Sequence, residues 1–543
     1  MNHLYYGDNL DIMRRYIDKE SVDLVYLDPP FNSSRNYNVI FEQKSDDAAG
    51  AQIKAFEDTW HWDHTAALAY KEITEAGGQI SIVMQAFRSF LGESDMMAYL
   101  VMMALRLVEL RRCLKATGSL YLHCDSTASH YLKILLDSIF ELNNFRSEII
   151  WKRQTAHSDA KYQFADVTDI LLFYGKSKNA KFNPTYTTHD PEYVGKFYRF
   201  NDNDGRGPYR LDNMASPNPR PKMMYTWKGF PWPEKGWRYQ IETMKKLDKE
   251  GRIYYPTKAN GSFDLTKRLC LKRFLTEQKG NIITNIWTDI NPLHSADAER
   301  LGYPTQKPEA LLERIIKASS NEGDVVLDPF CGCGTAIAVA QKLKRQWIGI
   351  DITHLAITLM KTRLRDTFGE PIKSEYKVIG EPVDLAGARE LAKTDPYQFQ
   401  WWALGLVGAR PVEQKKGADK GIDGRLFFHD DNSGKTRQVI FSVKAGQVHS
   451  SHIRDLAGVL EREKAEMGAV LTMEPPTRNM LREASAADLY ESKDLGKAFP
   501  KIQILTIEEL LKGRKPDIPY HAAATFKKAE KFESRDAEQE ELF

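Results

Sequence analysis

One mostly apolar run, VDLVYL from Val22 to Leu27, stops abruptly at an acid and two prolines. Its β-branched residues and its length predict a parallel strand covered on both faces. Pro29 and Pro30 cannot continue a strand ladder, so the strand has to end at Asp28. Open α/β sheets bind ligands at the carboxyl ends of their strands, which is where Asp28 and Phe31 are expected to lie. On this stretch alone, an ordinary proline turn is an equally good interpretation.

A second stretch, GDVVLDPFCGCGTAIAVAQKLKRQWIGIDI from Gly323 to Ile352, alternates apolar runs with a glycine-rich turn. The expected elements are a strand, a turn, a helix and a second strand over Val325–Asp328, Phe330–Gly334, Thr335–Lys344 and Trp347–Ile350. This order is typical of a ligand-binding βαβ unit, although a plain βαβ turn with glycines for packing has the same pattern.

The chemistry of this turn favours a nucleoside ligand. Glycines let backbone amides approach a ligand at a helix N-terminus, and Asp351 at the end of the next strand can accept hydrogen bonds from ribose hydroxyls. A dinucleotide fingerprint requires a glycine or alanine where this chain has Ile337. The sequence therefore argues against a dinucleotide and leaves a nucleoside ligand without a pyrophosphate open.

Composition limits the class of protein. A chain of 543 residues is expected to form roughly three or four compact units. Hydrophobic content of 42% and charged content of 28% are typical of a soluble globular protein. No apolar run approaches the roughly 20 residues that span a bilayer, and the N-terminus MNHLYYGDN lacks a signal pattern. Five cysteines do not form a disulfide framework, so we expect a cytoplasmic protein without membrane contact.

Together, DPPF at Asp28–Phe31 and FCGCG at Phe330–Gly334 resemble the motifs of amino-methylating DNA methyltransferases, the adenine-N6 and cytosine-N4 enzymes. The catalytic motif precedes the cofactor motif here, as in the permuted β group of that family. The resemblance implies an α/β fold: a doubly wound, Rossmann-like domain that binds S-adenosyl-L-methionine (SAM). Permutation only moves the chain break, so both motifs are expected to end neighbouring strands of one sheet.

Further segments fit the same family over roughly residues 1–368. They are YYGDNLDIM (5–13), GSLYLHCDST (118–127), EIIWKR (148–153), DILLFYGKS (169–177) and YPTQKPEALLERII (303–316). In the family, the acid of the first contacts the cofactor adenine and the last closes over the methionine end of the cofactor. The residues to which the resemblance assigns SAM binding are Asp8, Asn9, Thr305, Lys307, Asp328, Phe330, Gly332, Gly334, Thr335 and Asp351.

The resemblance assigns catalysis to Asp28, Pro29, Pro30 and Phe31. The Asp28 carboxylate and the Pro29 carbonyl can each accept one hydrogen bond from an exocyclic amine, which favours a tetrahedral nitrogen whose lone pair can attack a methyl group. Rigid prolines preorganise the two acceptors, and Phe31 offers a face for an extruded base.

The choice of base favours adenine, because many cytosine-N4 members have a serine in place of Asp28. Cytosine-C5 methylation is excluded, because that family uses a Pro-Cys pair and no cysteine of this chain follows a proline. Cys331 and Cys333 are interpreted as small residues in a tight loop, since no second pair completes a metal site. His61 and His123 lack a partner at a recognisable spacing and are left unassigned.

Between the motifs, residues 183–300 depart from the doubly wound rhythm and mix basic with aromatic residues. That mixture suits phosphate contacts combined with groove or stacking contacts, and the family places its target-recognition module here. The DNA-binding candidates are Arg206, Arg210, Arg220, Lys222, Lys228 and Arg238. Packing in a small satellite core is the alternative for the individual tryptophans Trp227, Trp232 and Trp237.

The C-terminal part resembles the PD-(D/E)xK nuclease core, close to Mrr-like restriction endonucleases, with Gly-Ile-Asp at 421–423 and a lysine at Lys444. Asp423 would hold Mg²⁺ and Lys444 would stabilise phosphate charge or orient water. Ser442 stands where the family has a second acid, so cleavage depends on compensation by Asp419 or Glu413. The expected helices lie around 396–406 and 452–464, and the expected strands over 437–446, 468–473 and 502–506.

The expected organisation has six parts. They are a catalytic half (1–182), a recognition insert (183–300), a SAM-binding half (301–368), a linker (369–390), a nuclease-like domain (391–515) and a tail (516–543) that is a frayed helix or disordered.

The leading interpretation is a site-specific adenine-N6 methyltransferase of double-stranded DNA, in restriction–modification or DNA defence in a bacterium or archaeon. Three alternatives stay open: a cytosine-N4 enzyme, a bifunctional enzyme that chiefly cleaves DNA, and a non-catalytic DNA-binding or scaffold protein. The intact DPPF and FCGCG motifs argue against the third. A homodimer and separate restriction subunits are both compatible with the sequence.

Overall fold

A computed structural model gives the fold as two compact units. One comprises residues 1–183 and 285–543, and the other residues 184–284. The residues that the structure describes are 1–29, 60–154, 162, 164–294, 297–301, 303, 305–412, 421–430, 436–492, 495–519, 522–523, 529 and 532.

The larger unit contains an extended sheet in which the described strands follow the order β11-β4-β5-β3-β2-β12-β13-β1-β14. β5 alone of these runs antiparallel to its neighbours. The strands are β1 (Asn2–Tyr6), β2 (Val22–Leu27), β3 (Leu114–Cys124), β4 (Phe145–Lys152), β5 (Thr168–Gly175), β11 (Ile286–Trp287), β12 (Val325–Asp328), β13 (Gln346–Asp351) and β14 (Tyr376–Ile379).

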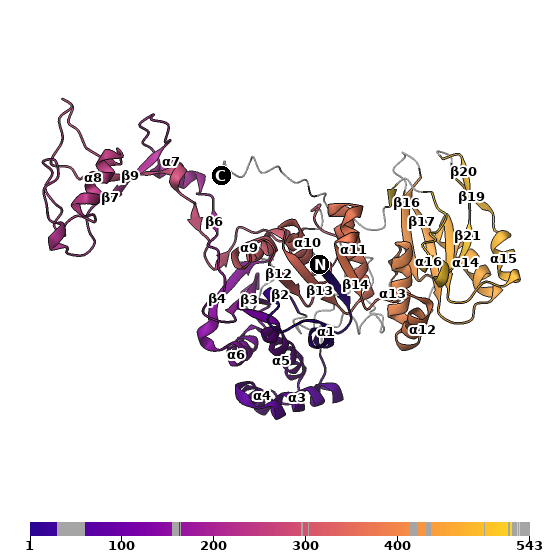
Figure 1. Ribbon diagram of the computed structural model, residues 1–543. Coiled ribbons are helices and arrows are strands. Elements are labelled where there is room, and N and C mark those ends of the chain that lie inside the picture. The colour runs from indigo at the N-terminus through magenta and orange to yellow at the C-terminus, as the bar shows by residue number, and fades with distance from the viewer. Residues whose placement is uncertain are drawn as a thin grey trace. The chain divides into compact units, whose positions relative to one another are not determined.

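Helices accompany this sheet, as Figure 1 shows. They are α1 (Asn9–Tyr16), α3 (His64–Ala76), α4 (Gly78–Leu91), α5 (Asp95–Cys113), α6 (Ser129–Phe140), α9 (Glu309–Ser319), α10 (Thr335–Lys342) and α11 (His354–Phe368). All six residues of β2 are buried, as expected for a central strand of a doubly wound sheet that is covered on both faces. The expected fold class is therefore confirmed.

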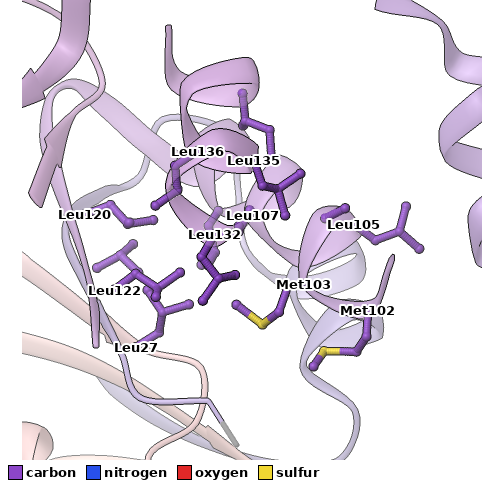
Figure 2. Close-up of a cluster of buried hydrophobic side chains, with 14 of the residues drawn as sticks. Leu27, Met102, Met103, Leu105, Leu107, Leu120, Leu122, Leu132, Leu135 and Leu136 are labelled. Carbon is purple, nitrogen blue, oxygen red and sulfur yellow. The ribbon is translucent and has the colours of Figure 1, made fainter. Parts of the chain in front are cut away.

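The core beneath the sheet is built mainly by α5 and α6. Leucine and methionine side chains from these helices meet leucines of β2 and β3, as Figure 2 shows. The labelled members are Leu27, Met102, Met103, Leu105, Leu107, Leu120, Leu122, Leu132, Leu135 and Leu136. Burying this much apolar surface fixes the position of the strands whose ends carry the polar residues.

The one acid inside β2, Asp23, is fully compensated. Its carboxylate lies 2.6 Å from Lys115 Nζ and 3.0 Å from Lys181 Nζ, and it accepts a hydrogen bond of 3.1 Å from the Val325 backbone. Asp23 thereby ties β2 to β12 at the amino ends of both strands, as a buried charge requires.

The predicted strand–turn–helix–strand unit is confirmed with small shifts at its ends. β12 has the predicted bounds, whereas α10 ends at Lys342, two residues before the predicted end. The helix cannot continue because Lys344 has a left-handed backbone with φ +58°. β13 begins at Gln346 and includes Asp351.

The C-terminal part of the same unit has its own sheet, in the order β15-β16-β17-β18-β21, with β22 beside β16. These strands are β15 (Arg410–Pro411), β16 (Gly424–His429), β17 (Arg437–Lys444), β18 (Met467–Thr472), β21 (Ile502–Thr506) and β22 (Ala522–Ala523), and a separate hairpin is formed by β19 (Leu489–Ser492) and β20 (Lys497–Pro500). The helices are α12 (Leu385–Thr394), α13 (Pro396–Val407), α14 (Ser450–Glu463), α15 (Arg478–Ser485) and α16 (Ile507–Leu511). The predicted helices and strands here are confirmed to within two residues. Most of the tail after residue 523 lies outside the described residues.

The smaller unit, residues 184–284, contains a three-stranded antiparallel sheet in the order β7-β9-β8, a short β6-β10 pair and two helices. Its elements are β6 (Tyr186–Thr187), α7 (Pro191–Phe197), β7 (Tyr209–Asn213), α8 (Ile241–Lys249), β8 (Ile253–Tyr254), β9 (Cys270–Phe274) and β10 (Asn281–Ile282). Trp227 and Trp237 are buried in its core, as the packing alternative predicted. That alternative was wrong for Trp232, which is 46% exposed.

In the described part of the chain, no helix is both long and apolar enough to cross a bilayer.

Candidate active site

The two motifs that are far apart in sequence end neighbouring strands. β2 and β12 pair in parallel, with Val25 opposite Leu327. Parallel strands bring their carboxyl ends to one edge, so Asp28 and Asp328 share that edge. Pro29 lies there too, whereas Pro30 and Phe31 are outside the described residues.

The Asp28 carboxylate has a cationic partner from the YPTQKP segment. Lys307 Nζ donates a hydrogen bond to Asp28 Oδ2, and both side chains are largely buried. Lys307 was predicted to bind the cofactor, and the structure brings it into contact with the predicted catalytic acid. A charge-assisted bond between two shielded groups fixes the carboxylate more firmly than one at the surface. Thr305, two residues earlier, is exposed.

The glycine turn needs its glycines for two separate reasons. Gly332 and Gly334 have left-handed backbones with φ +48° and +77°. A Cβ at Gly334 would lie 2.5 Å from Met360 Cγ on α11, and one at Gly332 would lie 3.0 Å from the Tyr303 ring. The turn is therefore pressed between α11 and the YPTQKP segment.

Two acids flank this turn. Asp351 Oδ2 accepts a hydrogen bond of 2.9 Å from the Gly332 backbone, and Asp351 Oδ1 accepts bonds of 2.9 Å from the backbone and hydroxyl of Thr353. Burial raises the pKa of Asp351 to about 6, although these hydrogen bonds act in the opposite direction. Burial, reinforced by the negative charges of Asp28 and Asp351, raises the pKa of Asp328 well above its usual value.

Asp8 and Asn9 follow the first strand, and Asn9 contacts the loop that follows β12. Asp8 caps α1 by accepting from the Leu10 and Asp11 amides, and its Oδ2 lies 2.6 Å from Arg106 Nη2. Asn9 is buried and donates a 2.7 Å hydrogen bond to the Pro329 carbonyl. Asn9 therefore has a direct structural role in positioning the loop that begins with Phe330, which is itself partly buried.

Thr335 at the start of α10 belongs to a buried polar cluster. Arg363 Nη1 donates a 3.0 Å hydrogen bond to Thr335 Oγ1, and Arg363 Nη2 lies 2.9 Å from Glu309 Oε1. The Thr335 hydroxyl thus links α10 to α11 and α9.

The edge as a whole fits a nucleoside ligand. The chemistry of the Asp351 carboxylate suits ribose hydroxyls, because it ends a parallel strand beside the glycine turn that leads into α10. Cys331 and Cys333 are buried in the turn, where the Cys331 thiol donates to the Ile350 carbonyl. Among the described residues, no group of three or more His, Cys, Asp or Glu side chains could hold a metal ion.

In the smaller unit, the predicted DNA-binding side chains differ in their contacts with the protein and in their exposure to solvent. Arg206 pairs with Asp204, Lys228 lies 2.6 Å from Asp248, and Arg210 donates to the Tyr193 hydroxyl. Four of the six, Arg220, Lys222, Lys228 and Arg238, are exposed. Exposed cations on a separately folded unit are available for phosphate contacts.

The C-terminal candidate site has its acid engaged by the protein itself. Asp423 Oδ2 accepts a 2.6 Å hydrogen bond from the Val443 backbone and one of 3.3 Å from the Ser442 hydroxyl, and Oδ1 accepts a 3.2 Å bond from Gln400. Lys444 Nζ lies 4.0 Å from Asp423 Oδ2. Asp419 and Glu413 lie outside the described residues. The described donor set, one acid beside a serine, does not fit a Mg²⁺ site.

The sequence matches two known families. A family model described as DNA methylase (N6_N4_Mtase) matches residues 22–362, which include the whole edge from Asp28 to Asp351. The chain belongs to this family of DNA methylases. A second family model, described as NACHT-associated inactive restriction endonuclease 1, matches residues 398–512. The methylase is therefore fused to a restriction-endonuclease-like domain.

Curated relatives of the methylase are restriction–modification proteins and related enzymes. The type II methyltransferase M.EcaI of Enterobacter cloacae is 30% identical over 364 residues, 66% of this chain and 69% of the relative. The type III StyLTI Mod subunit of Salmonella typhimurium is 25% identical over 69% of this chain and 54% of its own length. The DNA adenine methyltransferase YhdJ of Escherichia coli is 25% identical over 66% of this chain and 82% of its own.

Among solved structures, a putative DNA modification methylase of Thermus thermophilus, in complex with SAM, covers 70% of this chain and 99% of that chain at 15% identity and a TM-score of 0.33.

Sequence reasoning missed several polar residues of the methylase edge. Arg106 and Arg363 bind predicted site residues from helices that carry no motif, so no sequence signal identified them. His123 was left unassigned, yet it bonds to Tyr26 on β2 and Asp169 on β5. Its partners are visible only once the strand order is known.

Proposed function

We propose that this methylase transfers a methyl group from SAM to the N6 atom of an adenine extruded from double-stranded DNA. The observation that carries the proposal is the shared edge, where Asp28 at the end of β2 adjoins the glycine turn and Asp351. Asp28, which we assign to the base, and Asp351, which we assign to the ribose, thus both lie at the ends of strands in one sheet.

The base-side chemistry follows from the end of β2. Asp28 Oδ2 is held by Lys307, which leaves the remaining carboxylate oxygen and the Pro29 carbonyl to accept the two amine protons of the base. Drawing both protons out of the ring plane frees the nitrogen lone pair. Because the acceptors are fixed before reaction, little reorganisation is needed when charge develops on nitrogen. Phe31 is the proposed stacking face for the extruded base.

The proposed SAM residues lie on the other side of the same edge. Asp351 would accept the ribose hydroxyls, while the Gly332–Gly334 turn presents backbone amides at the N-terminus of α10. When bound, SAM supplies an electrophilic methyl group on a sulfonium. Asp8, Asn9, Asp328, Phe330, Thr335, Thr305 and Lys307 are the remaining proposed contacts or supports.

Adenine is favoured over cytosine by the aspartate before the prolines, and the curated relative YhdJ is named a DNA adenine methyltransferase. The names of M.EcaI and the StyLTI Mod subunit support a role in restriction–modification.

We further propose that Mg²⁺-dependent cleavage is absent from the C-terminal domain, because Asp423 is occupied by internal hydrogen bonds and Ser442 replaces a second acid. The family description of that domain as inactive agrees.

The substitution Asp28→Asn tests the catalytic assignment. It keeps the size of the side chain but removes the charge, so transfer of labelled methyl groups to DNA should fall by roughly 100-fold or more. SAM affinity measured by calorimetry should stay within about twofold, because the acid acts on the base. Wild-type transfer rates in this variant would refute the role of Asp28.

A further inference from the structure

A buried chain of polar side chains crosses the sheet directly beside the catalytic acid. The Tyr26 hydroxyl lies 3.0 Å from His123 Nδ1, and His123 Nε2 lies 3.0 Å from Asp169 Oδ2. Arg153 Nε forms an ion pair with Asp169 Oδ1 at 3.1 Å. Tyr26, His123 and Asp169 are all nearly inaccessible to solvent. We call these four residues the His123 network.

The register of the sheet places the network at the carboxyl end of β2. Tyr26 lies two residues before Asp28 and therefore on the same face of the strand. Leu27 pairs with Leu122, so the next position along β3, His123, is level with Asp28. Antiparallel β5 starts at this same edge, which brings Asp169 within reach of His123.

Two hydrogen bonds join the three buried side chains. Tyr26 keeps its proton, because burial and the nearby charges of Asp28 and Asp328 raise its pKa well above the usual value. A protonated hydroxyl can donate or accept, so Tyr26 and His123 Nδ1 share one hydrogen bond, and His123 Nε2 and Asp169 share the other. Burial raises the pKa of Asp169, but the hydrogen bond and electrostatic interaction with His123, together with the charges of Lys307 and Arg153, outweigh it and leave the pKa lowered. Asp169 is thus an ionised acceptor.

Ring packing reinforces the polar contacts. The His123 ring meets the Tyr26 ring edge-on at 6.3 Å and the Trp151 ring edge-on at 5.9 Å. The network and its rings thus connect β2, β3, β5 and β4. Buried polar groups are costly to leave unpaired, so the two hydrogen bonds of His123 favour one arrangement of these strands.

We propose that His123 is a positioning residue for methyl transfer, which holds the end of β2 through Tyr26 and so fixes the Asp28 carboxylate and the Pro29 carbonyl. This inference rests on the proposed function, because His123 can position Asp28 for methyl transfer only if Asp28 takes part in that reaction. Tyr26 and His123 are both buried, so we assign their effect to the backbone of β2, where small displacements of an acceptor reduce rates strongly.

The decisive experiment compares two tyrosine-to-phenylalanine substitutions in the full chain. Tyr26→Phe removes only the hydroxyl that bonds to His123. Tyr121→Phe is the matched control, since Tyr121 is buried on neighbouring β3, opposite Tyr26, and its hydroxyl bonds to Ser319 at 2.7 Å. The readouts are kcat and the KM for SAM and DNA in labelled-methyl transfer, with thermal melting of each variant.

Tyr26→Phe should lower kcat by roughly tenfold or more with both KM values nearly unchanged, whereas Tyr121→Phe should leave kcat at the wild-type value. A wild-type kcat in Tyr26→Phe, or equal losses of kcat in both variants, would overturn the assignment. If the wild-type chain transfers no methyl group, the proposed function fails and the positioning role fails with it.

A rescue series separates positioning from simple packing. His123→Asn keeps a side-chain amide that can donate to or accept from the Tyr26 hydroxyl, whereas His123→Leu removes any hydrogen-bond partner for it. The asparagine variant should retain several-fold more kcat than the leucine variant. Equal kcat values in the two variants would show that the hydrogen bond to Tyr26 does not matter and would contradict the proposal.

Discussion

At the scale of single residues, the methylase edge depends on acids in contrasting environments. Asp28 is paired with Lys307 and Asp8 with Arg106, whereas Asp351 is buried beside the neutral donors of Gly332 and Thr353. Neutral donors offset burial less than a cation does, so the pKa of Asp351 is raised to about 6. Ribose hydroxyls need an acceptor, and the ionised carboxylate is the better one.

The pH dependence of SAM binding follows. Well above pH 6 Asp351 is ionised and SAM should bind at full strength, and as the pH falls through about 6 the carboxylate becomes protonated. The dissociation constant for SAM should therefore rise below pH 6, approaching roughly tenfold for each further pH unit. Calorimetric titrations between pH 5 and pH 8 measure this change. In Asp351→Asn the affinity should be weaker and nearly independent of pH, and a wild-type affinity that is flat across this range would contradict the account.

Residue chemistry was only partly visible in the sequence. Asp28, the prolines and the glycine turn were predictable because a proline ends a strand and a left-handed φ requires glycine. The ion pair between Lys307 and Asp28 was not, since it joins residues 279 positions apart. The contacts of His123 were also not predictable from the sequence, because its hydrogen-bond partners lie on β2 and β5.

At the scale of elements, apolar runs in the sequence predicted which segments form strands more accurately than the residues at which the elements end. β2 and β12 were recognisable because both are short, β-branched and followed by proline. The end of α10 was missed because the left-handed backbone of Lys344 is set by packing rather than by its residue type. The five short strands of residues 184–284 gave no periodic signal at all.

The contacts of Asp423 beside β16 and β17 bear on the proposal that the C-terminal domain does not cleave DNA. Val443 on β17 donates its amide to Asp423, which directly precedes β16, so the acid is satisfied without a metal. Supercoiled plasmid incubated with the protein and Mg²⁺ should therefore stay uncut, and Lys444→Ala should change nothing. Nicking by the wild type that disappears in Lys444→Ala would contradict this interpretation.

At the scale of the whole molecule, the chain divides into two units with separate cores. The smaller one has its own buried cluster, which includes Met214, Trp227, Phe230 and Trp237. A unit with its own core can unfold independently of the rest.

Trp227→Ala should unfold the smaller unit selectively. Removing a buried tryptophan costs about 3–5 kcal/mol, a large part of the stability of a domain of about 100 residues. Calorimetry should show one lowered transition with SAM affinity unchanged, and DNA affinity should fall because the proposed recognition surface is lost. Trp232→Ala is the matched control and should leave the melting transitions unchanged, since Trp232 is 46% exposed. Unaltered DNA affinity in Trp227→Ala despite a melted unit would contradict the recognition role.

The central claim is that the edge formed by β2 and β12 methylates the amino group of adenine. Mass spectrometry of nucleosides, from DNA incubated with purified protein and SAM labelled on its methyl group, tests it most directly. The account predicts labelled N6-methyladenine with the wild-type protein and almost none with Asp28→Asn. Labelled N4-methylcytosine would contradict the choice of base, and the absence of any labelled nucleoside would contradict the claim itself.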